Sequence, residues 1–419
     1  MQALEKKREA GYTFNIMRKY LPLILILCVC GVCAGIFFFI SKKESEKNYI
    51  AFYALSADTV QALQTVLKDR FPNIEQQFEW KIADPSVSIT EFMEKNPQTV
   101  FIFSQDNRSL FEARQFFIRH DEERFQYLPS TFENNIFSQK PEDTYYGFPL
   151  LINPIKLACN SKLAAKIGIN SYIIEDDFDR ICTAAKSSMA FPFVCAAGDD
   201  EQLFAMISAV IAIHGARITP EDFSSLGKDA DLHTCCPPAL KAAFDTLVEW
   251  KRQGFLHPEW FRLLDSDIAV FMEFNHTALA AMPLSASRKL KQDILQNFLT
   301  LQIPLPLLLD KRNMPASVIV WAQSIQPSKR QELSDSMNAI REFLYEQQTD
   351  ELLAHETGLA PVFSAAQVQD SEASSGRYWA ASSNMVLPFF GDIVCTSGTE
   401  KAQLADSIRR YLTVDGVSY

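Results

Sequence analysis

Residues 50–80 read IAFYALSADTVQALQTVLKDRFPNIEQQFEW, and this stretch decides the fold class. Ile50–Leu55 is an apolar run of strand length, and Ser56 follows it as the N-cap of an amphipathic helix. Pro72-Asn73 ends that helix, and Ile74–Trp80 then alternates side-chain types with the period of two that is typical of a strand. A strand, a helix and a second strand in this order predict parallel pairing in an α/β sheet.

A third strand is predicted further along the same unit. Thr99–Ser104 (TVFIFS) is a continuous apolar run, which is typical of a strand that is covered on both faces of its sheet. Ligands of open α/β sheets bind beyond the carboxyl ends of the strands. The polar residues that follow the predicted strands are therefore the first candidate ligand contacts, namely Ser56, Asp58 and Asp106.

The N-terminal region predicts a membrane anchor. Leu21–Ile40 is uncharged, and at about 1.5 Å per residue a helix of this length reaches about 30 Å, the thickness of a bilayer's hydrocarbon core. Basic residues precede this segment, so residues 1–20 are expected as a cytoplasmic tail, residues 21–40 as a single transmembrane helix, and the rest on the extracytoplasmic (periplasmic) side of the cell membrane. Two alternatives remain open: a cleaved signal peptide, whose apolar part is usually shorter, and a lipid-modified Cys33.

Charge and length limit the class of the exported part. Residues 44–419 carry 33 Lys and Arg against 49 Asp and Glu, and an acidic domain is a poor partner for the phosphates of nucleic acid. About 375 residues are long for one compact core and suit two lobes. We therefore expect a two-lobed extracytoplasmic domain that does not bind nucleic acid.

Motifs for metal, cofactor or nucleophilic chemistry are missing from the sequence. There is no HExxH, GxSxG, GxxxxGK or GxGxxG, and the only His/Cys cluster is His233-x-Cys235-Cys236. Asp176-Asp177 and Asp199-Asp200-Glu201 could supply the two acids of a glycoside hydrolase, but both runs fall at predicted helix N-termini, where acids stabilise the helix dipole. We expect no catalytic activity, no metal and no cofactor, with a periplasmic glycoside hydrolase kept as a minor alternative.

Several short motifs occur along the chain in a fixed order. They are Tyr146-Gly147-Phe148-Pro149, Asn153-Pro154, Asn160-Ser161-Lys162-Leu163, Gly254-Phe255-Leu256-His257-Pro258 and Thr357-Gly358-Leu359-Ala360-Pro361. In order and spacing they resemble the family of extracellular solute-binding proteins that includes the maltose- and other sugar-binding proteins of ABC importers. The resemblance extends over nearly all of residues 50–413.

This resemblance implies an α/β fold of two lobes, with a hinge and an interlobe cleft that closes on its ligand. On this basis residues 44–152 and 318–366 form lobe 1, and residues 153–317 and 367–419 form lobe 2. The implied function is to capture a small solute, a sugar or oligosaccharide, and to present it to ABC permease subunits. Pro283–Ser287 replaces the family's usual Gly-x-Trp, so a ligand-free structural or sensory module on the same fold is the alternative.

The resemblance also adds candidate ligand contacts. Tyr146, Trp321, Phe389 and Phe390 fall in or near segments that line the family's cleft, where aromatic faces stack on a sugar. Gln202 and Ser285 are polar residues at the ends of predicted elements. Together with Ser56, Asp58 and Asp106 they complete the predicted ligand-binding set.

Overall fold

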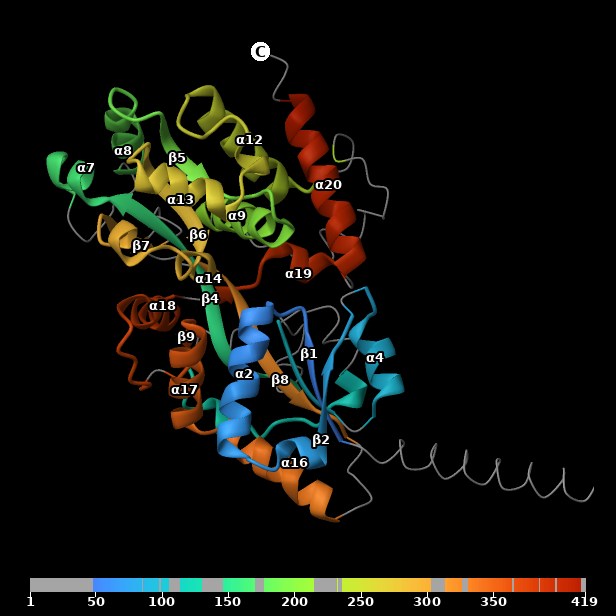
Figure 1. Ribbon diagram of the computed structural model, residues 1–419. Helices are drawn as coiled ribbons and strands as arrows, with labels where there is room; N and C mark the ends of the chain where they lie inside the picture. Colours follow the sequence, from blue (N-terminus) through green and yellow to red (C-terminus); the bar gives the residue numbers. More distant parts are fainter. Residues whose placement is uncertain are drawn as a thin grey trace, which may run out of the picture.

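The computed structural model describes residues 48–84, 86–97, 99–104, 114–129, 146–169, 177–214, 232, 236–302, 313–325, 331–363, 365–383, 385–395 and 398–415. Within this part, the chain is a mixed α/β protein with two halves, each built around strands and covered by helices (Figure 1). Strand β4 (Phe148–Asn160) runs from one half into the other.

The first half begins with the strand, helix and strand unit that the sequence predicts. β1 (Asn48–Tyr53) pairs in parallel with β2 (Phe78–Ile82) on one side and with β3 (Thr99–Ser104) on the other. The intervening helix α2 (Ala57–Arg70) is capped by Ser56, whose Oγ accepts the Thr59 amide at 3.2 Å. The expected parallel pairing and the expected cap are therefore confirmed.

The expectation of a strand over Ile74–Trp80 is only partly correct. Ile74–Gln77 forms one helical turn, α3, and the strand begins at Phe78. The turn continues from the end of α2, because the Ile74 amide donates to the Phe71 carbonyl at 2.9 Å. The Ile74 side chain is buried in the core, so tertiary packing overrides the local alternation.

Two long antiparallel strands join the halves. β4 pairs with β8 (Asn313–Gln323) from Phe148 to Pro154, and from Ile155 onward it pairs with β6 (Thr277–Pro283). β8 in turn pairs with β3, which gives the continuous order β2-β1-β3-β8-β4-β6-β5. β4 continues as a single strand through Asn153 and Pro154, because both residues pair across to β8.

The described part of the second half contains β5 (Phe191–Cys195), which runs parallel to β6, together with several long helices. These are α9 (Asp200–Ile213), α12 (Pro238–Arg252) and α20 (Gly398–Asp415). The remaining elements are α4 (Ile89–Lys95), η1 (Arg114–Phe116), α6 (Glu122–Phe125), α7 (Ser161–Lys166), α8 (Asp177–Ala185), η4 (Trp260–Arg262), α13 (Asp265–Glu273), α14 (Leu284–Ser287), α15 (Gln292–Leu295), β7 (Phe298–Gln302), α16 (Gln331–Leu344), α17 (Gln347–Thr357), β9 (Ala360–Pro361), α18 (Ser371–Ser382), β10 (Met385–Leu387) and α19 (Phe390–Val394).

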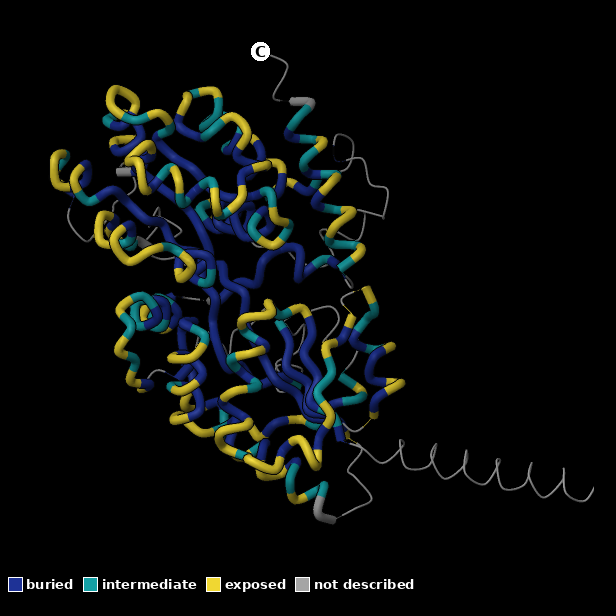
Figure 2. The backbone as a smooth tube through the Cα atoms, in the orientation of Figure 1, coloured by how far each residue is buried: buried dark blue, intermediate teal, exposed yellow. Residues whose placement is uncertain are grey.

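Each half has its own hydrophobic core. The first core gathers side chains from β1, β3, β8, α2 and α17, and the second gathers side chains from β5, β6, α9, α12 and α20. Figure 2 shows buried backbone along the strands of both halves and exposed residues on the outer helices. Ala380 of α18 and Val386 of β10 belong to the first core, whereas Phe389, only three residues later, belongs to the second. The chain therefore passes between the halves again just after β10.

The predicted transmembrane segment Leu21–Ile40 lies outside the described residues. Among the residues that the structure does describe, no helix has both the length and the apolar character needed to cross a membrane.

Candidate functional site

A cavity of about 640 Å³ lies where elements of the two halves face each other. From the first half it is lined by the start of α2 and the end of α17. From the second half it is lined by the starts of α9 and α13 and by the segment around α14, which follows β6. We call it the interlobe cavity; its lining residues are Ser56, Asp58, Thr59, Asp199, Glu201, Gln202, Leu264, Asp265, Ser266, Pro283, Ser285, Ala286, Arg288, Lys289, Glu356, Thr357 and Leu359.

Helix N-termini converge on this cavity, and side chains of the chain itself cap them. Asp199 accepts the amides of Glu201 and Gln202 at 2.9 and 3.3 Å at the start of α9. At the start of α13, the carboxylate of Asp267 accepts the Leu264 amide at 2.9 Å. Because the amides of these first turns are already partly satisfied by acids, the helix starts offer less to an anionic ligand than open N-termini would.

The cavity wall is tied directly to the strand that joins the halves. The Ser285 amide donates to Asn153 Oδ1 at 2.9 Å, and Asn153 Nδ2 donates to Ser285 Oγ, also at 2.9 Å. Asn153 belongs to β4 and lies next to Pro154, where that strand changes partner from β8 to β6. Movement of the halves at this point of β4 would therefore be transmitted to Ser285 in the cavity.

Carboxylates dominate the electrostatics of the cavity. Glu201 lines the cavity with an exposed side chain. Partial desolvation by the surrounding protein, reinforced by Asp392 and Asp199 and opposed by Lys401 and Lys289, raises its pKa to about 7. Burial also raises the pKa of Asp265, although its hydrogen bond from Gln202 Nε2 at 2.8 Å opposes the shift. Both acids therefore bind a proton at a higher pH than a free carboxyl group does.

Arg288 and Lys289 are the cations in the described lining. Arg288 forms an ion pair with Asp370, the N-cap residue of α18, and its guanidinium packs against Gly358. Gly358 ends α17 in the left-handed conformation, with φ of 68°, and a Cβ there would lie 2.4 Å from Arg288 Nε. A glycine at this position therefore lets the arginine pass close to the backbone.

Four of the predicted ligand contacts line the interlobe cavity: Ser56, Asp58, Gln202 and Ser285. Ser56 and Asp58 come from the first half, and Gln202 and Ser285 from the second. Asp106 lies outside the described residues.

The predicted aromatic contacts lie in the cores and do not line the cavity. Trp321 is 0% exposed in β8, and its indole meets the ring of His120 edge-on at 4.6 Å. Phe389 and Phe390 are each 1% exposed, and Phe390 packs against Phe204. Tyr146 is half-buried against the first core. In this structure Trp321, Phe389 and Phe390 are therefore core packing residues, and Tyr146 packs against the first core without being fully buried.

Several lining residues were missed or interpreted differently at the level of sequence. Asp199 and Glu201 were noted as an acidic run whose role was helix capping, which Asp199 does perform. Asp265, Glu356 and the cations at 288 and 289 carried no motif. The sequence does indicate that most of these residues lie at the start or end of a helix. Which helix ends come together around one cavity is set by the fold and could not be predicted from the sequence.

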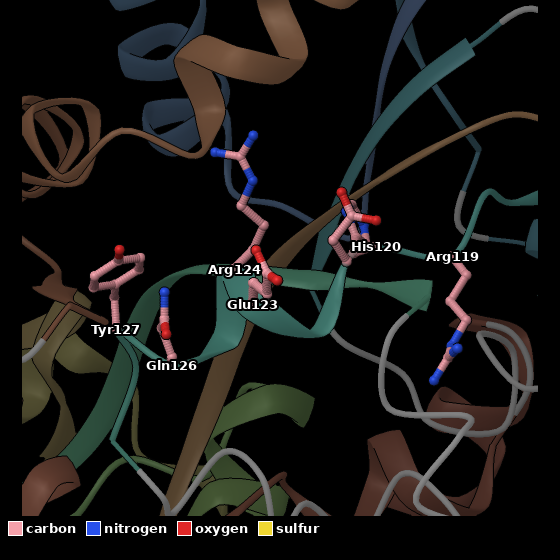
Figure 3. A pocket seen from close by; sticks show the side chains of 7 residues that line it. Arg119, His120, Glu123, Arg124, Gln126 and Tyr127 are labelled. Carbon is pink, nitrogen blue, oxygen red and sulfur yellow. The ribbon is translucent and has the colours of Figure 1, made fainter.

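A second cavity, of about 860 Å³, is lined by residues of one short segment, from Arg119 to Tyr127 (Figure 3). Its lining combines Arg119, Arg124, Asp121 and Glu123 with His120, whose imidazole is buried and hydrogen-bonded to the Tyr345 hydroxyl. All of its described lining comes from the first half. It therefore lacks the two-sided construction of the interlobe cavity, which we take as the candidate binding site.

Among the described residues, no cluster of three or more His, Cys, Asp or Glu side chains is arranged to hold a metal ion. The thiols of Cys159, Cys182 and Cys195 are free and buried, and Cys395 is buried as well.

Comparison with known proteins gives matches in structure alone. No family model and no curated protein matches the sequence. Among solved structures, the bacterial solute receptor AcbH, described as having an exclusive preference for β-D-galactopyranose, aligns with a TM-score of 0.65 at 10% identity, over 89% of this chain and 99% of the receptor. The putative binding protein MsmE of Bacillus subtilis, in an open conformation, aligns with a TM-score of 0.64 at 14% identity, over 89% and 94% of the two chains.

A chitin oligosaccharide binding protein aligns with a TM-score of 0.61 at 15% identity, over 88% of this chain and 95% of that protein. These neighbours are binding proteins rather than enzymes. The resemblance that the sequence motifs suggested is therefore matched by the architecture. The chain has the two-lobed α/β fold of the sugar and oligosaccharide solute-binding proteins.

Proposed function

We propose that this protein is an extracytoplasmic solute-binding protein that closes its two lobes over a small solute, a sugar or oligosaccharide, and delivers it to the permease subunits of an ABC importer. The observation that carries the proposal is the interlobe cavity, whose polar lining is contributed by both halves of a fold shared with sugar-binding proteins. Such a cavity encloses a ligand only when the halves approach each other.

The predicted division has residues 44–152 and 318–366 in lobe 1 and residues 153–317 and 367–419 in lobe 2, and we propose to extend lobe 1 to the end of β10. The change of partner along β4 at Pro154 and Ile155 supports the first crossing. The packing of Ala380 and Val386 in the first core favours a later final crossing, between Leu387 and Phe389. In that assignment α18 and β10 move with lobe 1.

We further propose that Leu21–Ile40 tethers the binding domain to the cell membrane with the lobes outside the cytoplasm. The uncharged length of the segment and the basic residues before it support this. Alkaline carbonate extraction of cell membranes tests it: the full chain should stay in the membrane pellet, and a chain starting at residue 44 should be released.

The capture role is tested by thermal shift of the full chain, purified in a nonionic detergent, against sugars, oligosaccharides, amino acids and peptides. We expect at least one of these solutes to raise the melting temperature in a saturable manner. The double variant Gln202→Ala and Ser285→Ala should lose this effect, whereas Gln126→Ala, in the second cavity, should keep it. If no solute stabilises the protein, a ligand-free structural or sensory module becomes the better account.

Glycoside hydrolysis is the second candidate, and the raised pKa of Glu201 is the observation that favours it, because a general acid needs such a shift. The two acids that precede Glu201 already have other partners. Asp199 caps α9, and Asp200 forms an ion pair with Arg409 at 2.7 Å. We therefore expect no release of reducing sugar from glycosides. Turnover that Glu201→Gln abolishes would overturn the binding-only role.

A further inference from the structure

One arginine of the second half reaches into a notch of the first half. Arg288 directly follows α14, and Ala286 of that turn packs in a hydrophobic cluster with residues of β6. The Arg288 guanidinium forms an ion pair with Asp370 and packs against Gly358. Gly358 ends α17, and Asp370 is the N-cap residue of α18. Arg288 therefore lies between the end of one helix and the start of another.

Both helices that form this notch belong to the first half. α17 contributes Leu353 to the first core, and α18 contributes Ala380. Gly376 allows α18 to pack closely on β9, since a Cβ at this position would lie 2.8 Å from the Cβ of Ala360. The contacts of Arg288 therefore join the two halves of the molecule.

A second ion pair crosses between the halves beside the first. Glu372 of α18 pairs with Lys156, which lies in the part of β4 that pairs with β6 in the second half. Burial lowers the pKa of Lys156, and the charges of Glu372 and Asp370 oppose this shift. The charge of Arg288 adds to the lowering. Two acids at the start of α18 and two cations of the second half thus form one network of interacting charges.

The Arg288 end of this network is the part that can adjust. Arg288 lines the interlobe cavity next to the end of α17, so movement of the halves that widens the cavity there would separate it from Asp370 and Gly358. The side chains of Arg288 and Asp370 are 36% and 28% exposed. Water and salt therefore reach the pair, and it can break without unfolding of either half.

We propose that Arg288, Asp370, Lys156 and Glu372 form an electrostatic clasp that holds the two halves in the relative position seen in this structure and limits opening of the interlobe cavity. This interlobe clasp is a property of the fold, and it does not depend on which solute is captured. When the clasp is weakened, the halves occupy a wider range of relative positions.

Distances between spin labels on the two halves test the clasp in the full chain, in a nonionic detergent and without solute. The labels are attached to p-azidophenylalanine at the exposed positions of Asp69 in α2 and Lys166 in α7, because the chain has nine cysteines of its own. Arg288→Gln and Asp370→Asn should each broaden the distance distribution. Asparagine caps a helix about as well as aspartate does, so Asp370→Asn removes the charge and keeps the cap.

Matched variants show whether the effect belongs to the clasp. Combining Arg288→Gln with Asp370→Asn should broaden the distribution no more than either change alone, because both remove the same ion pair. Arg124→Gln is the control. Arg124 pairs with Glu342 at 2.8 Å, and this pair also joins distant segments and is partly exposed, but both residues lie in the first half. Its loss should leave the distribution unchanged.

Salt gives a second measurement that does not depend on the folding of a variant. Raising the salt concentration from about 20 to about 200 mM should broaden the distribution of the wild type, because salt screens a partly exposed pair. The response should be smaller in Arg288→Gln, in which the pair is already absent. An equal response in both proteins would contradict the role of Arg288.

Unchanged distributions in both Arg288→Gln and Asp370→Asn would overturn the clasp. Equal broadening in Arg124→Gln would overturn it as well, since general loss of stability would then explain the effect. The measurements are made without solute, so they leave the capture role to the thermal-shift experiment, and failure of one proposal is distinguishable from failure of the other.

Discussion

At the scale of single residues, His120 shows how burial sets the pH dependence of stability. Its imidazole is 2% exposed beside Phe148, Trp321 and Tyr345. Burial lowers its pKa to about 3, with the charge of Arg341 adding to the effect, whereas an unfolded histidine titrates near 6.5. Between these two values the unfolded chain binds a proton that the folded protein excludes, so stability is lost as pH falls below about 6.5.

We therefore predict that the free energy of unfolding falls between pH 7 and pH 5, with His120 contributing up to about 1.4 kcal/mol per pH unit. Urea denaturation at pH 7, 6 and 5 measures this. His120→Phe should flatten the pH dependence, while His355→Phe should not, because the His355 side chain is 78% exposed. Equal slopes for the wild type and His120→Phe would contradict this role of His120.

Glu201 gives a second prediction at this scale, for solute affinity. With a pKa of about 7, its carboxylate is mostly charged at pH 8 and mostly protonated at pH 6. Desolvation by the surrounding protein raises this pKa most, Asp392 and Asp199 raise it further, and Lys401 and Lys289 oppose the shift. The affinity for the solute that gives the largest thermal shift should therefore differ between pH 8 and pH 6 in the wild type and differ less in Glu201→Gln, because the charge in the cavity wall changes over this range. An unchanged affinity in the wild type would exclude a role for this carboxylate.

At the scale of secondary-structure elements, a buried ion pair fixes α18 to the strand that joins the lobes. Lys156 of β4 has a side chain that is 1% exposed, and it pairs with Glu372 of α18. Glu372 also accepts the hydroxyls of Ser287 at 3.0 Å and Thr300 at 3.2 Å. One carboxylate thus holds α18, α14 and β7 together around β4, although α18 packs its apolar side against the first core.

We predict that Lys156→Met destabilises the protein by about 3 kcal/mol, because it leaves the Glu372 carboxylate buried without its cation. The double variant Lys156→Met and Glu372→Leu should recover much of this loss, since an apolar pair needs no compensation. Chemical denaturation of the two variants measures both effects. A single variant as stable as the wild type would show that the pair contributes little.

Elements with strong local signals were predictable from the sequence. Ser56 caps α2, and the apolar run Thr99–Ser104 forms β3 with the same bounds. Ile74–Gln77 was predicted wrongly, because its burial against the core depends on the chain around it. Lys156 could not be recognised as a buried charge either, since its partner lies more than two hundred residues away in the sequence.

At the scale of the whole molecule, the site depends on which helix ends the fold brings together. Ser56, Asp58, Gln202 and Ser285 were predicted because each lies at the end of an element, and helix ends line the interlobe cavity. Trp321, Phe389 and Phe390 were chosen by analogy with aromatic contacts, yet this chain buries them in its cores. Asp265 and Glu356 belong to the cavity only through tertiary structure.

The proposed function requires that a solute binds between the lobes and contacts both of them. Hydrogen exchange of the full chain, with and without the solute that gives the largest thermal shift, measures this. We predict slower exchange at the start of α2 and the end of α17 together with the starts of α9, α13 and α14, because closure covers both walls of the interlobe cavity. Slower exchange confined to residues 119–127 around the second cavity, or to one lobe alone, would contradict the claim.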